Sequence, residues 1–413
     1  CVELAVAEAL RRAEQRYGAP LSAAGERTAN TVLGMGKLGG RELNVGSDVD
    51  LLPFYETDEG EVRKDGAPCD QSLHEHYTRV TQRFTATLED VTEDGACWRV
   101  DLRLRPEGSR GPLVNALAAA ERYYETWGRT WERAALLRAR PVGGDLSFGE
   151  RLLSALSGFV WRRAIDPRIA QEMTQLVHRA RAELSQEPER DLKHGVGGIR
   201  EAEFFVQSLQ LIWGGKDASL RSSNTLEALR RLRSRGLVTD RESREVESAY
   251  LALRRVEHRV QLATGIQTHS LPRGELLETI ARSLGHASVH ELEKDLDKTR
   301  RRVAARFASL TRSLGGADER APELEPLFAA IDAGEEAQVL AALGDAGGLD
   351  FVASASPDLA RHLVALGSRP DFPLGASTRD RHPSLAPRLL EAVADAADPE
   401  QAARLLYAFF SRV

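Results

Sequence analysis

The sequence predicts an α+β protein, in which a head that contains a small sheet is followed by helices. Short apolar runs that end in glycine or turn residues are confined to the chain before about residue 112. After about residue 117, apolar residues recur at three- and four-residue steps, which is the helical period. The 413 residues are 42% hydrophobic and 29% charged, as in globular domains and unlike disordered chains.

Charge and composition exclude several classes of protein. The net charge of −6 disfavours a protein that coats nucleic acid, so we expect no nucleic-acid partner. No run approaches the roughly 18 apolar residues that a membrane span needs. Three scattered cysteines, Cys1, Cys69 and Cys97, suit neither a disulfide framework nor a zinc site, so we expect a cytoplasmic protein. The chain begins at Cys1 without a leader, and we expect it to be a piece of a longer polypeptide.

The head is predicted to alternate helices and strands. Alternation and helical periodicity predict a helix over residues 3–16, strands over 31–36 and 48–55, a helix over 71–89 and a strand over 97–105. Pro53 suggests that the second of these strands lies at a sheet edge or carries a bulge. After Pro112 no further strand is predicted.

Helices fill the rest of the predicted fold. The capping box Thr239-Asp-Arg-Glu242 starts a helix that runs to Gly265, and Asn224 starts another that ends at Gly236. Trp127 and Trp131 are predicted to pack in the core from one helix, and the run Arg300–Arg302 to be a solvated helix face. We predict a head over 1–145, a helical bundle over 146–315 and a truncated helical linker region over 316–413.

A glycine-rich turn follows the first predicted strand. Gly34-Met-Gly-Lys-Leu-Gly39 matches the dinucleotide-binding fingerprint G-x-G-x-x-G. That fold needs a long helix after the third glycine, whereas turn residues and a new strand follow here. We therefore favour glycines that let the backbone approach a phosphate, with Gly34, Gly36 and Lys37 as candidate binding residues.

Three aspartates are candidate metal ligands. Asp48 and Asp50, two apart on a strand, project from the same face, and their carboxylates repel unless a cation lies between them. Asp101 on the third predicted strand would complete a site for Mg²⁺ of the kind that serves phosphoryl chemistry. The alternatives are an ordinary turn at Gly46-Ser47-Asp48 and a simple ion pair between Asp101 and the arginines predicted on its face, Arg99, Arg103 and Arg105.

A second glycine-rich loop precedes a predicted helix. Gly195, Gly197 and Gly198 would offer free backbone N–H groups to an anion at the helix start. Lys193 and Arg200 would add positive charge beside them. The alternative is an ordinary loop before a helix whose apolar residues are core.

These motifs together resemble a known family. Six segments carry the resemblance: Gly34–Asn44, Gly46–Leu51, Arg99–Pro106, Gly111–Leu113, Trp131–Arg133 and Arg138–Arg140. They resemble the bifunctional glutamine synthetase adenylyltransferase/adenylyl-removing enzymes of bacteria. The resemblance implies a DNA polymerase beta-like nucleotidyltransferase fold, in which Asp48, Asp50 and Asp101 hold Mg²⁺. Gly34, Gly36, Lys37 and Ser47 would then cradle phosphate oxygens.

The family's chain carries two catalytic halves in tandem, and this sequence holds one. Gly197-Gly-Ile-Arg-Glu-Ala-Glu-Phe204 resembles the GGIREIEF pattern of the amino-terminal, deadenylylating half rather than GGLVDIEF of the adenylylating half. Ala202 departs from the usual Ile, and His194-Gly-Val196 also departs from the family loop. Arg381–Leu390 resembles the linker between the halves, so the adenylylating half would lie beyond Val413.

The resemblance implies a reaction and partners. Phosphate would remove AMP from a tyrosine of glutamine synthetase, giving ADP and active synthetase, with Lys193 and Arg200 binding the phosphate. The alternatives are the forward transfer of AMP from ATP with release of pyrophosphate, and a non-catalytic docking module for the synthetase or a PII-type signalling protein. No histidine is assigned a metal role, since neither His74 and His76 nor His286 and His290 have zinc-site context.

Overall fold

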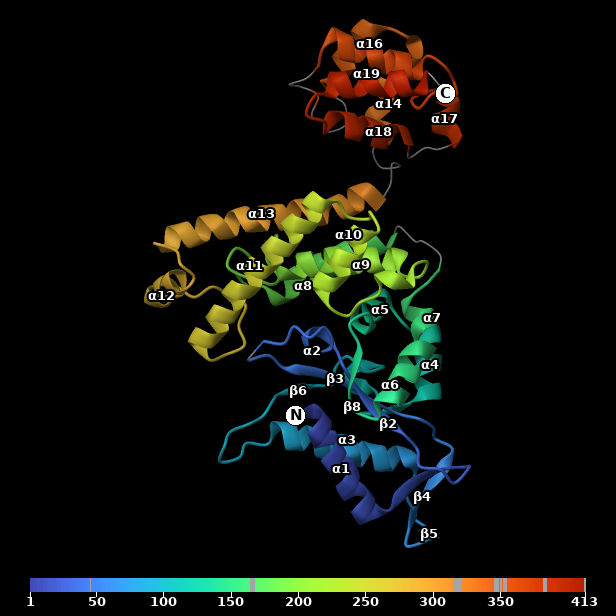
Figure 1. Cartoon of the computed structure of the whole chain (residues 1–413), viewed down its shortest axis with the longest axis vertical. Coiled ribbons are helices and arrows are strands. Elements are labelled where there is room, and N and C mark those ends of the chain that lie inside the picture. Colours follow the sequence, from blue (N-terminus) through green and yellow to red (C-terminus); the bar gives the residue numbers. More distant parts are fainter. Residues whose placement is uncertain are drawn as a thin grey trace. The chain divides into compact units, whose positions relative to one another are not determined.

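The structure is a computed structural model that describes residues 1–44, 46–163, 168–314, 321–344, 349, 351, 355–381 and 385–411. These residues form two compact units, Cys1–Ser309 and Leu310–Val413, which are described separately (Figure 1). Helices and strands together make an α+β protein, as predicted. The finer division at residues 145 and 315 stays a prediction.

A mixed sheet lies at the centre of the head in the first unit. Its strands are β2 (Asn30–Gly34), β3 (Val49–Tyr55), β6 (Val100–Asp101), β7 (Asn115–Ala116) and β8 (Arg140–Gly144), in the order β6-β3-β2-β8 with β7 also paired to β3. β2 runs antiparallel to β3 and β8, whereas β6 and β7 run parallel to β3. A smaller antiparallel sheet contains β1 (Ala19–Ser22), β4 (Gly60–Lys64) and β5 (Ala67–Pro68).

The strand predictions need three corrections. The strand predicted over residues 97–105 is too long, because only Val100 and Asp101 pair with β3. The chain then turns, and the backbone N–H of Arg103 donates to the Asp101 carboxylate. Strands β7 and β8 lie after Pro112, where none was predicted. The β8 sequence contains a proline and two glycines, which disfavour strands, and it pairs with β2 through an irregular register. The small second sheet was also missed.

Pro53 lies in the middle of β3, where it pairs with Val32 of β2. On the other side of β3, β6 pairs with residues 49–50 and β7 with residues 54–55. Pro53 therefore occupies the stretch of β3 that has no neighbouring strand on that side among the described residues, where its missing N–H costs no sheet hydrogen bond.

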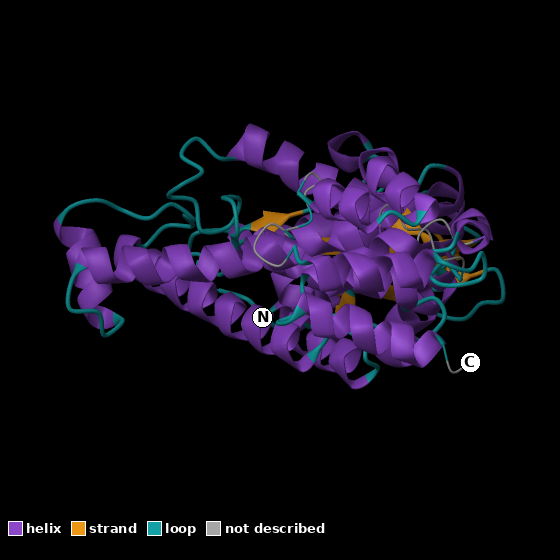
Figure 2. Ribbon diagram, turned by 90° about the horizontal axis from the view of Figure 1, so that it is seen from above, coloured by secondary structure: helices purple, strands orange, loops and turns teal. Residues whose placement is uncertain are grey.

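Helices pack against both faces of the sheet. Figure 2 shows that helices make up most of the molecule, with the strands lying among them. The helices of the head are α1 (Val2–Tyr17), α2 (Gly36–Gly39), α3 (Leu73–Glu89), α4 (Leu117–Thr126), α5 (Thr130–Leu136), α6 (Leu146–Ala155) and α7 (Ser157–Val160), with a 3₁₀ turn at Gly108–Arg110. Leu51 packs with residues of α1 and α3, whereas the next residue, Leu52, packs with Phe148 of α6. Successive strand residues point to opposite faces, so one strand serves both cores.

The remaining helices of the first unit follow the head. They are α8 (Arg168–Leu184), α9 (Ile199–Trp213), α10 (Thr225–Ser234), α11 (Asp240–Thr264), α12 (Glu275–Ser283) and α13 (Val289–Leu314, whose end belongs to the second unit), with a 3₁₀ turn at Ala218–Leu220. The predicted boundaries of α10 and α11 are confirmed. Thr239 and Glu242 form a capping box, Asn224 caps α10, and Gly265 ends α11 with φ 67°.

One prediction about side chains is wrong, and a second holds for the exposed Arg301 and Arg302 but not for Arg300. Trp127 and Trp131 do not share a helix, because α4 ends before Gly128, and Trp127 is 71% exposed and Trp131 36% exposed instead of lying in the core. Arg300 is not part of a solvated face. Its guanidinium bonds to the backbone carbonyl groups of Pro188, Glu189 and Asp191 and thereby ties α13 to the loop before α9.

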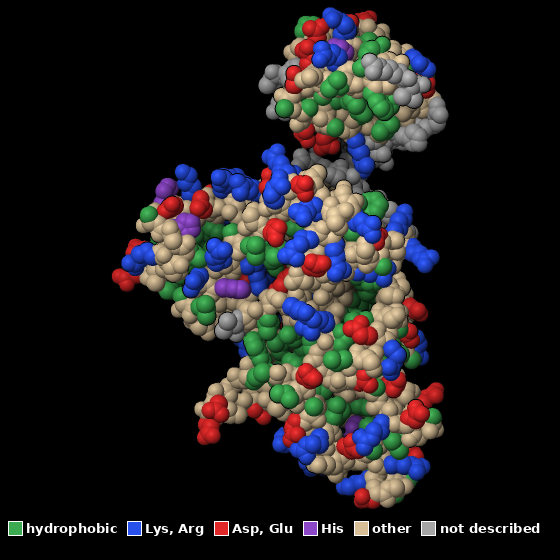
Figure 3. Space-filling model, viewed as in Figure 1, with side chains coloured by type: hydrophobic (Ala, Val, Ile, Leu, Met, Phe, Trp, Pro, Cys, Tyr) green, Lys and Arg blue, Asp and Glu red, His purple; other side chains and the backbone are tan. Residues whose placement is uncertain are grey.

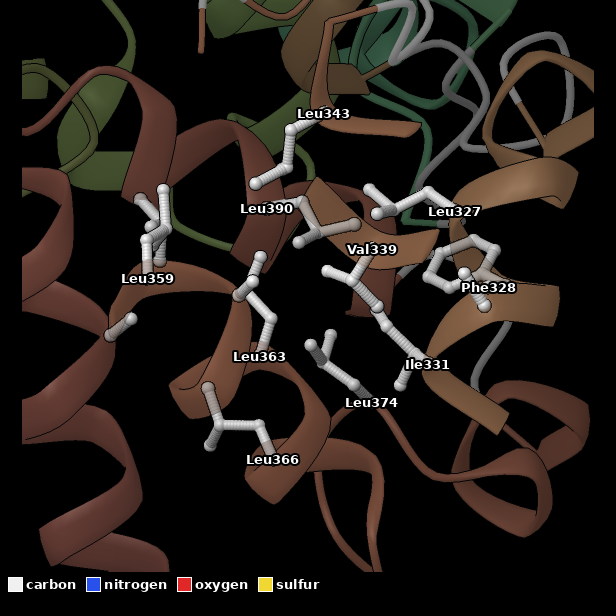
Figure 4. Close-up of a cluster of buried hydrophobic side chains, with 14 of the residues drawn as sticks. Leu327, Phe328, Ile331, Val339, Leu343, Leu359, Leu363, Leu366, Leu374 and Leu390 are labelled. Carbon is white, nitrogen blue, oxygen red and sulfur yellow. The ribbon is translucent and has the colours of Figure 1, made fainter. Parts of the chain in front are cut away.

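The second unit has its own apolar core. Its helices are α14 (Ala321–Ala333), α15 (Glu336–Leu343), α16 (Pro357–Gly367), α17 (Ala376–Arg381), α18 (Leu385–Ala394) and α19 (Pro399–Phe410). Figure 4 shows leucines of α15, α16 and α18 gathered in one buried cluster with Ile331 and Phe328 of α14. Residues 382–384, within the stretch that resembles the family's linker, lie outside the described residues. In the described part of the chain no helix is long and apolar enough to cross a membrane.

Candidate nucleotidyltransferase site

The sheet brings two of the predicted aspartates together. In the parallel pairing of β3 with β6, Asp50 lies directly opposite Asp101, and Asp48 comes just before β3. Burial, with the nearby carboxylates of Asp101 and Asp48, raises the pKa of Asp50 to about 6. The other two carboxyl groups that the sequence singled out thus act on the charge of Asp50.

Two arginines neutralise the outer members of this group. Arg99 pairs with Asp48 at 2.7 Å, and Arg103 pairs with Asp101 at 2.6 Å. Burial favours the neutral form of Asp101, but the hydrogen bonds from Arg103 outweigh it and lower the pKa of this carboxyl. The ion pair weighed as the alternative for Asp101 is therefore present. Both arginine side chains are mostly exposed, at 67% and 79%, so each is anchored mainly at its carboxylate.

The fit of these residues to Mg²⁺ follows from their chemistry. In the described residues no three His, Cys, Asp or Glu side chains are already disposed around a common metal position. The donor set itself suits Mg²⁺, since carboxylate oxygens are its preferred ligands. Burial and the neighbouring carboxylates both disfavour the charged form of Asp50, and a cation would offset both effects.

The first glycine-rich turn passes close to Asp50. Gly36 has φ +49°, and a Cβ added to it would lie 3.0 Å from Asp50 Oδ2. The Met35 N–H donates to the Asp50 carbonyl at 2.9 Å, which holds the turn against β3. Helix α2 has four residues and β2 is antiparallel to β3, so the long helix and parallel sheet of a dinucleotide-binding fold are absent from this described segment. Gly34, by contrast, is packed against Val142 and Leu38.

The side chain of Lys37 extends from the glycine-rich turn to helix α11. Figure 1 shows that the helices after the head lie next to α2. The Lys37 ammonium donates to Oε1 of Glu257 on α11 at 3.0 Å, and the Lys37 side chain is 13% exposed. Burial, aided by the charge of Arg254, lowers the pKa of Lys37 although Glu257 opposes the shift. Ser47 is buried, and its N–H donates to the Asn44 carbonyl.

Lys193 and Arg200 lie near the same carboxyl group. The charge of Lys193 lowers the pKa of Asp50, and Asp50 in turn supports the charged form of Arg200. Burial, together with the charges of Arg200 and Lys37, lowers the pKa of Lys193 to about 8. Arg200 Nε is buried without a hydrogen-bond partner. These cations and Asp50 belong to one electrostatic neighbourhood although they come from distant parts of the chain.

The second glycine-rich loop corrects one expectation. The N–H groups of Gly195, Gly197 and Gly198 are not free, because they donate to the carbonyl of Asp191, the carboxylate of Glu201 and the carbonyl of Gly195. A Cβ on Gly197 would lie 2.0 Å from the Arg300 carbonyl oxygen. The glycines therefore allow close packing against α13, as in the alternative of an ordinary loop, and any anion would be bound by side chains.

Sequence reasoning missed a set of buried and half-buried carboxylates on α9, on α11 and in the segment between α2 and β3. Glu203 and Glu42 both pair with Arg138, and Glu42 also accepts from Tyr250 and from the Thr225 N–H. Glu257 is fully buried among four polar partners. Glu203 could have been found, because it lies in the Gly197–Phe204 motif. Nothing in the sequence around Glu257 predicts its burial, since a glutamate on a long helix is ordinarily exposed.

In the face shown in Figure 3, Lys and Arg side chains are interspersed with Asp and Glu. The described cysteines are free thiols.

Comparisons with known proteins relate the chain to the family that its motifs resemble. Residues 1–155 match the family model described as glutamate-ammonia ligase adenylyltransferase, and residues 167–311 match the model described as GlnD PII-uridylyltransferase. The chain is 38% identical over 408 residues to the bifunctional glutamine synthetase adenylyltransferase/adenylyl-removing enzyme of Burkholderia mallei, covering 95% of this chain and 44% of that protein. The enzyme of the same name from Rhodopseudomonas palustris is 42% identical over 285 residues, covering 68% of this chain and 28% of that protein.

A third relative of that name, from Xanthomonas campestris, is 38% identical over 98% of this chain and 42% of its own length. The chain thus spans less than half the length of these curated relatives.

Proposed function

Because the chain is related over almost its whole length to the bifunctional glutamine synthetase adenylyltransferase/adenylyl-removing enzymes, we propose that it is a nucleotidyltransferase acting on glutamine synthetase. The proposed direction is removal of AMP from an adenylylated tyrosine by inorganic phosphate. The observation that best supports a nucleotidyltransferase site is the juxtaposition of Asp50 and Asp101 with the cations Lys193 and Arg200. The direction rests on the resemblance of Gly197–Phe204 to the deadenylylating half of the family.

The proposed fold of the head is that of the DNA polymerase beta-like nucleotidyltransferases. Its support is the mixed sheet with the two carboxylates on adjacent strands, beside a glycine turn. Residues 1–145 would form this catalytic domain, residues 146–315 a helical bundle and residues 316–413 part of a linker region. We expect a cytoplasmic enzyme.

The proposed reaction exchanges one bond to phosphorus for another. An oxygen of inorganic phosphate forms a bond to the α-phosphorus of the AMP group, the bond from that phosphorus to the tyrosyl oxygen breaks, and the tyrosine regains a proton. The products are ADP and unmodified synthetase.

The roles of the chain's residues follow from their charges. Asp48, Asp50 and Asp101 would hold Mg²⁺, which when bound supplies positive charge to the phosphoryl oxygens. Lys193 and Arg200 would bind the incoming phosphate, since they carry positive charge near Asp50 and the Arg200 Nε has a hydrogen bond still to make. Gly36 leaves room for a phosphate oxygen near Asp50 because it has no side chain. Gly34, Lys37 and Ser47 complete the proposed cradle.

A PII-type signalling protein is a proposed partner. Its support is the match of residues 167–311 to a model described as a PII-uridylyltransferase.

The direct experiment incubates the purified chain with adenylylated glutamine synthetase, Mg²⁺ and phosphate and follows the formation of ADP. We expect ADP that depends on phosphate and is lost in Asp50→Asn. ATP-dependent labelling of unmodified synthetase without ADP release from the modified form would mean that the forward transfer is the activity. If neither reaction occurs, the chain is a docking module or acts only together with further sequence.

Lys193→Ala tests the phosphate site. We expect the KM for phosphate to rise about tenfold while the KM for adenylylated synthetase changes little, because a cation that binds phosphate directly is removed. Lys216→Ala, at an exposed position of the same unit, is the matched control and should leave both constants unchanged. An unaltered phosphate dependence in Lys193→Ala would reject the assignment.

A further inference from the structure

Glu257 is a fully buried carboxylate in α11 with both oxygens occupied. Oε1 lies 3.0 Å from Lys37 Nζ and 2.9 Å from His269 Nδ1, while Oε2 lies 3.0 Å from Asn44 Nδ2 and 3.1 Å from the Arg254 guanidinium. Burial alone would raise its pKa, but the hydrogen bond from His269 and the charges of Lys37 and Arg254 outweigh that effect and lower it. Glu257 is therefore a charged group at the centre of a polar network.

The partners of Glu257 come from two segments that flank the proposed site. Lys37 and Asn44 lie in the segment between β2 and β3, which includes the turn beside Asp50. His269 lies after α11, and its carbonyl accepts from the N–H of Leu192, next to Lys193. Gln267, two residues earlier, accepts from Arg99, which pairs with Asp48. The Glu257 carboxylate thus joins the glycine turn to the segment after α11, which in turn contacts Leu192 and Arg99, the neighbours of Lys193 and Asp48.

Lys37 depends on this carboxylate. The charges of Lys193 and Lys37 oppose one another in the buried site, and Arg254 also disfavours the Lys37 charge. Glu257 accepts the hydrogen bond of Lys37 and offsets that repulsion. A lysine ammonium has three donors, so two remain after the bond to Glu257.

We propose that Glu257 is a positioning residue that fixes the Lys37 ammonium beside the glycine turn, so that its remaining donors serve the phosphate groups of the nucleotide. The role rests on the proposed function, in which Lys37 binds phosphate oxygens. It assigns to the helical part of the chain a contribution to a site whose carboxylates come from the sheet. Glu257 acts through Lys37 and does not itself touch the nucleotide.

The test is a double-mutant cycle on the full chain with Glu257→Gln and Lys37→Met. The binding of ADP with Mg²⁺ is measured by calorimetry, and the KM for phosphate by ADP release from adenylylated synthetase. We expect each single variant to weaken ADP binding about tenfold and to raise the KM for phosphate, with a smaller effect on kcat. In the Lys37→Met background, Glu257→Gln should change the affinity less than twofold. Glu257→Asp, which keeps the charge, should recover most of the affinity.

Glu42→Gln is the matched control, because the Glu42 carboxylate also joins this segment to α11 but has no described bond to the Lys37 ammonium. The backbone hydrogen bond from the Glu42 N–H to the Lys37 carbonyl is retained in this variant. It should lower the melting temperature, and any effect on affinity should add to that of Lys37→Met. Equal effects of Glu257→Gln in the wild-type and Lys37→Met backgrounds, or unchanged ADP affinity, would overturn the proposal. If Glu257→Gln does not fold, Lys37→Arg decides, because it keeps the positive charge but moves the donors. ADP binding should then weaken as in Lys37→Met, whereas wild-type affinity in Lys37→Arg would overturn the proposal.

The two hypotheses fail differently. A wild-type chain that binds ADP but releases none from adenylylated synthetase would contradict the proposed reaction, while the ADP-binding cycle would still test Glu257.

Discussion

At the scale of single residues, Asp50 shows how a site can oppose stability. Its carboxyl is buried beside two others, and its pKa is raised from 3.8 to about 6. A raised carboxyl pKa means that the folded state prefers the proton more than the unfolded chain does. The contribution of Asp50 to the free energy of unfolding is therefore favourable at low pH, and it is lost as pH rises through the pKa of the folded state.

Asp50→Asn should accordingly stabilise the chain at pH 7.5 in the absence of Mg²⁺. At this pH the ionised Asp50 carboxylate lowers the free energy of unfolding by at most about 3 kcal/mol, which is the free-energy equivalent of its pKa change. Thermal melts of wild type and variant at pH 7.5 and pH 4 measure the effect, which should shrink at the lower pH. Mg²⁺ should raise the melting temperature of the wild type more than that of the variant. Equal melting temperatures at both pH values would contradict this account.

The same titration predicts the pH dependence of the proposed activity. Because Mg²⁺ binds the ionised carboxylate, ADP release at subsaturating Mg²⁺ should rise as pH increases through about 6 and then level off. Raising the Mg²⁺ concentration should move the midpoint to lower pH, since metal and proton compete for Asp50. A midpoint that does not respond to Mg²⁺ would contradict the role of Asp50 as a metal ligand.

At the scale of elements, the loop before α9 shows that a glycine motif can serve packing. Gly197 has φ +68° and lies against the backbone of Arg300 on α13, while the Arg300 side chain bonds to carbonyl groups of the same loop. The two segments are thus joined by both the backbone and the side chain of one residue.

Gly197→Ala should destabilise the first unit strongly, because its Cβ would lie 2.0 Å from a carbonyl oxygen in addition to the strain of a positive φ. Gly236→Ala is the matched control. Gly236 has φ +71° but nothing within 4 Å of an added Cβ, so its cost should be the backbone strain alone, roughly 1–2 kcal/mol. Denaturant melts of the two variants measure the difference, and equal losses would show that contact with α13 is unimportant.

At the scale of the whole molecule, the chain has two units with separate cores. The core of Leu310–Val413 contains residues of that unit alone, including Leu363 at its centre (Figure 4). The site residues Asp50, Lys193 and Glu257 all lie in the other unit. Stability of the second unit should therefore be separable from the site.

Leu363→Ala should lower the stability of the second unit by about 2–5 kcal/mol, because a fully buried leucine leaves a cavity. We expect differential scanning calorimetry to show two transitions, of which the variant shifts one. ADP binding at a temperature below both transitions should be unchanged. A single transition that shifts as a whole would show that the two units unfold together.

The sequence by itself determined the class of fold and the family. The boundaries of α10 and α11 are legible because caps and glycines act within a few residues of the chain. The Asp48–Asp50 pair was also visible, since side chains two apart on a strand share a face. Short motifs such as Gly34–Asn44 carried the resemblance that the comparisons confirm.

Only the tertiary structure decided which residues meet across long separations. Strand β8 forms because β2 offers it a paired edge, although its proline and glycines disfavour a strand. Trp127 is exposed just after the end of α4 at Thr126, next to Gly128, which packs too closely on Phe159 to carry a Cβ. Arg300 is bound because α13 passes the loop before α9. Glu257 meets Lys37 across 220 residues of sequence. Local patterns encode local hydrogen bonds, whereas burial and charge pairing depend on which surfaces the folded chain brings together.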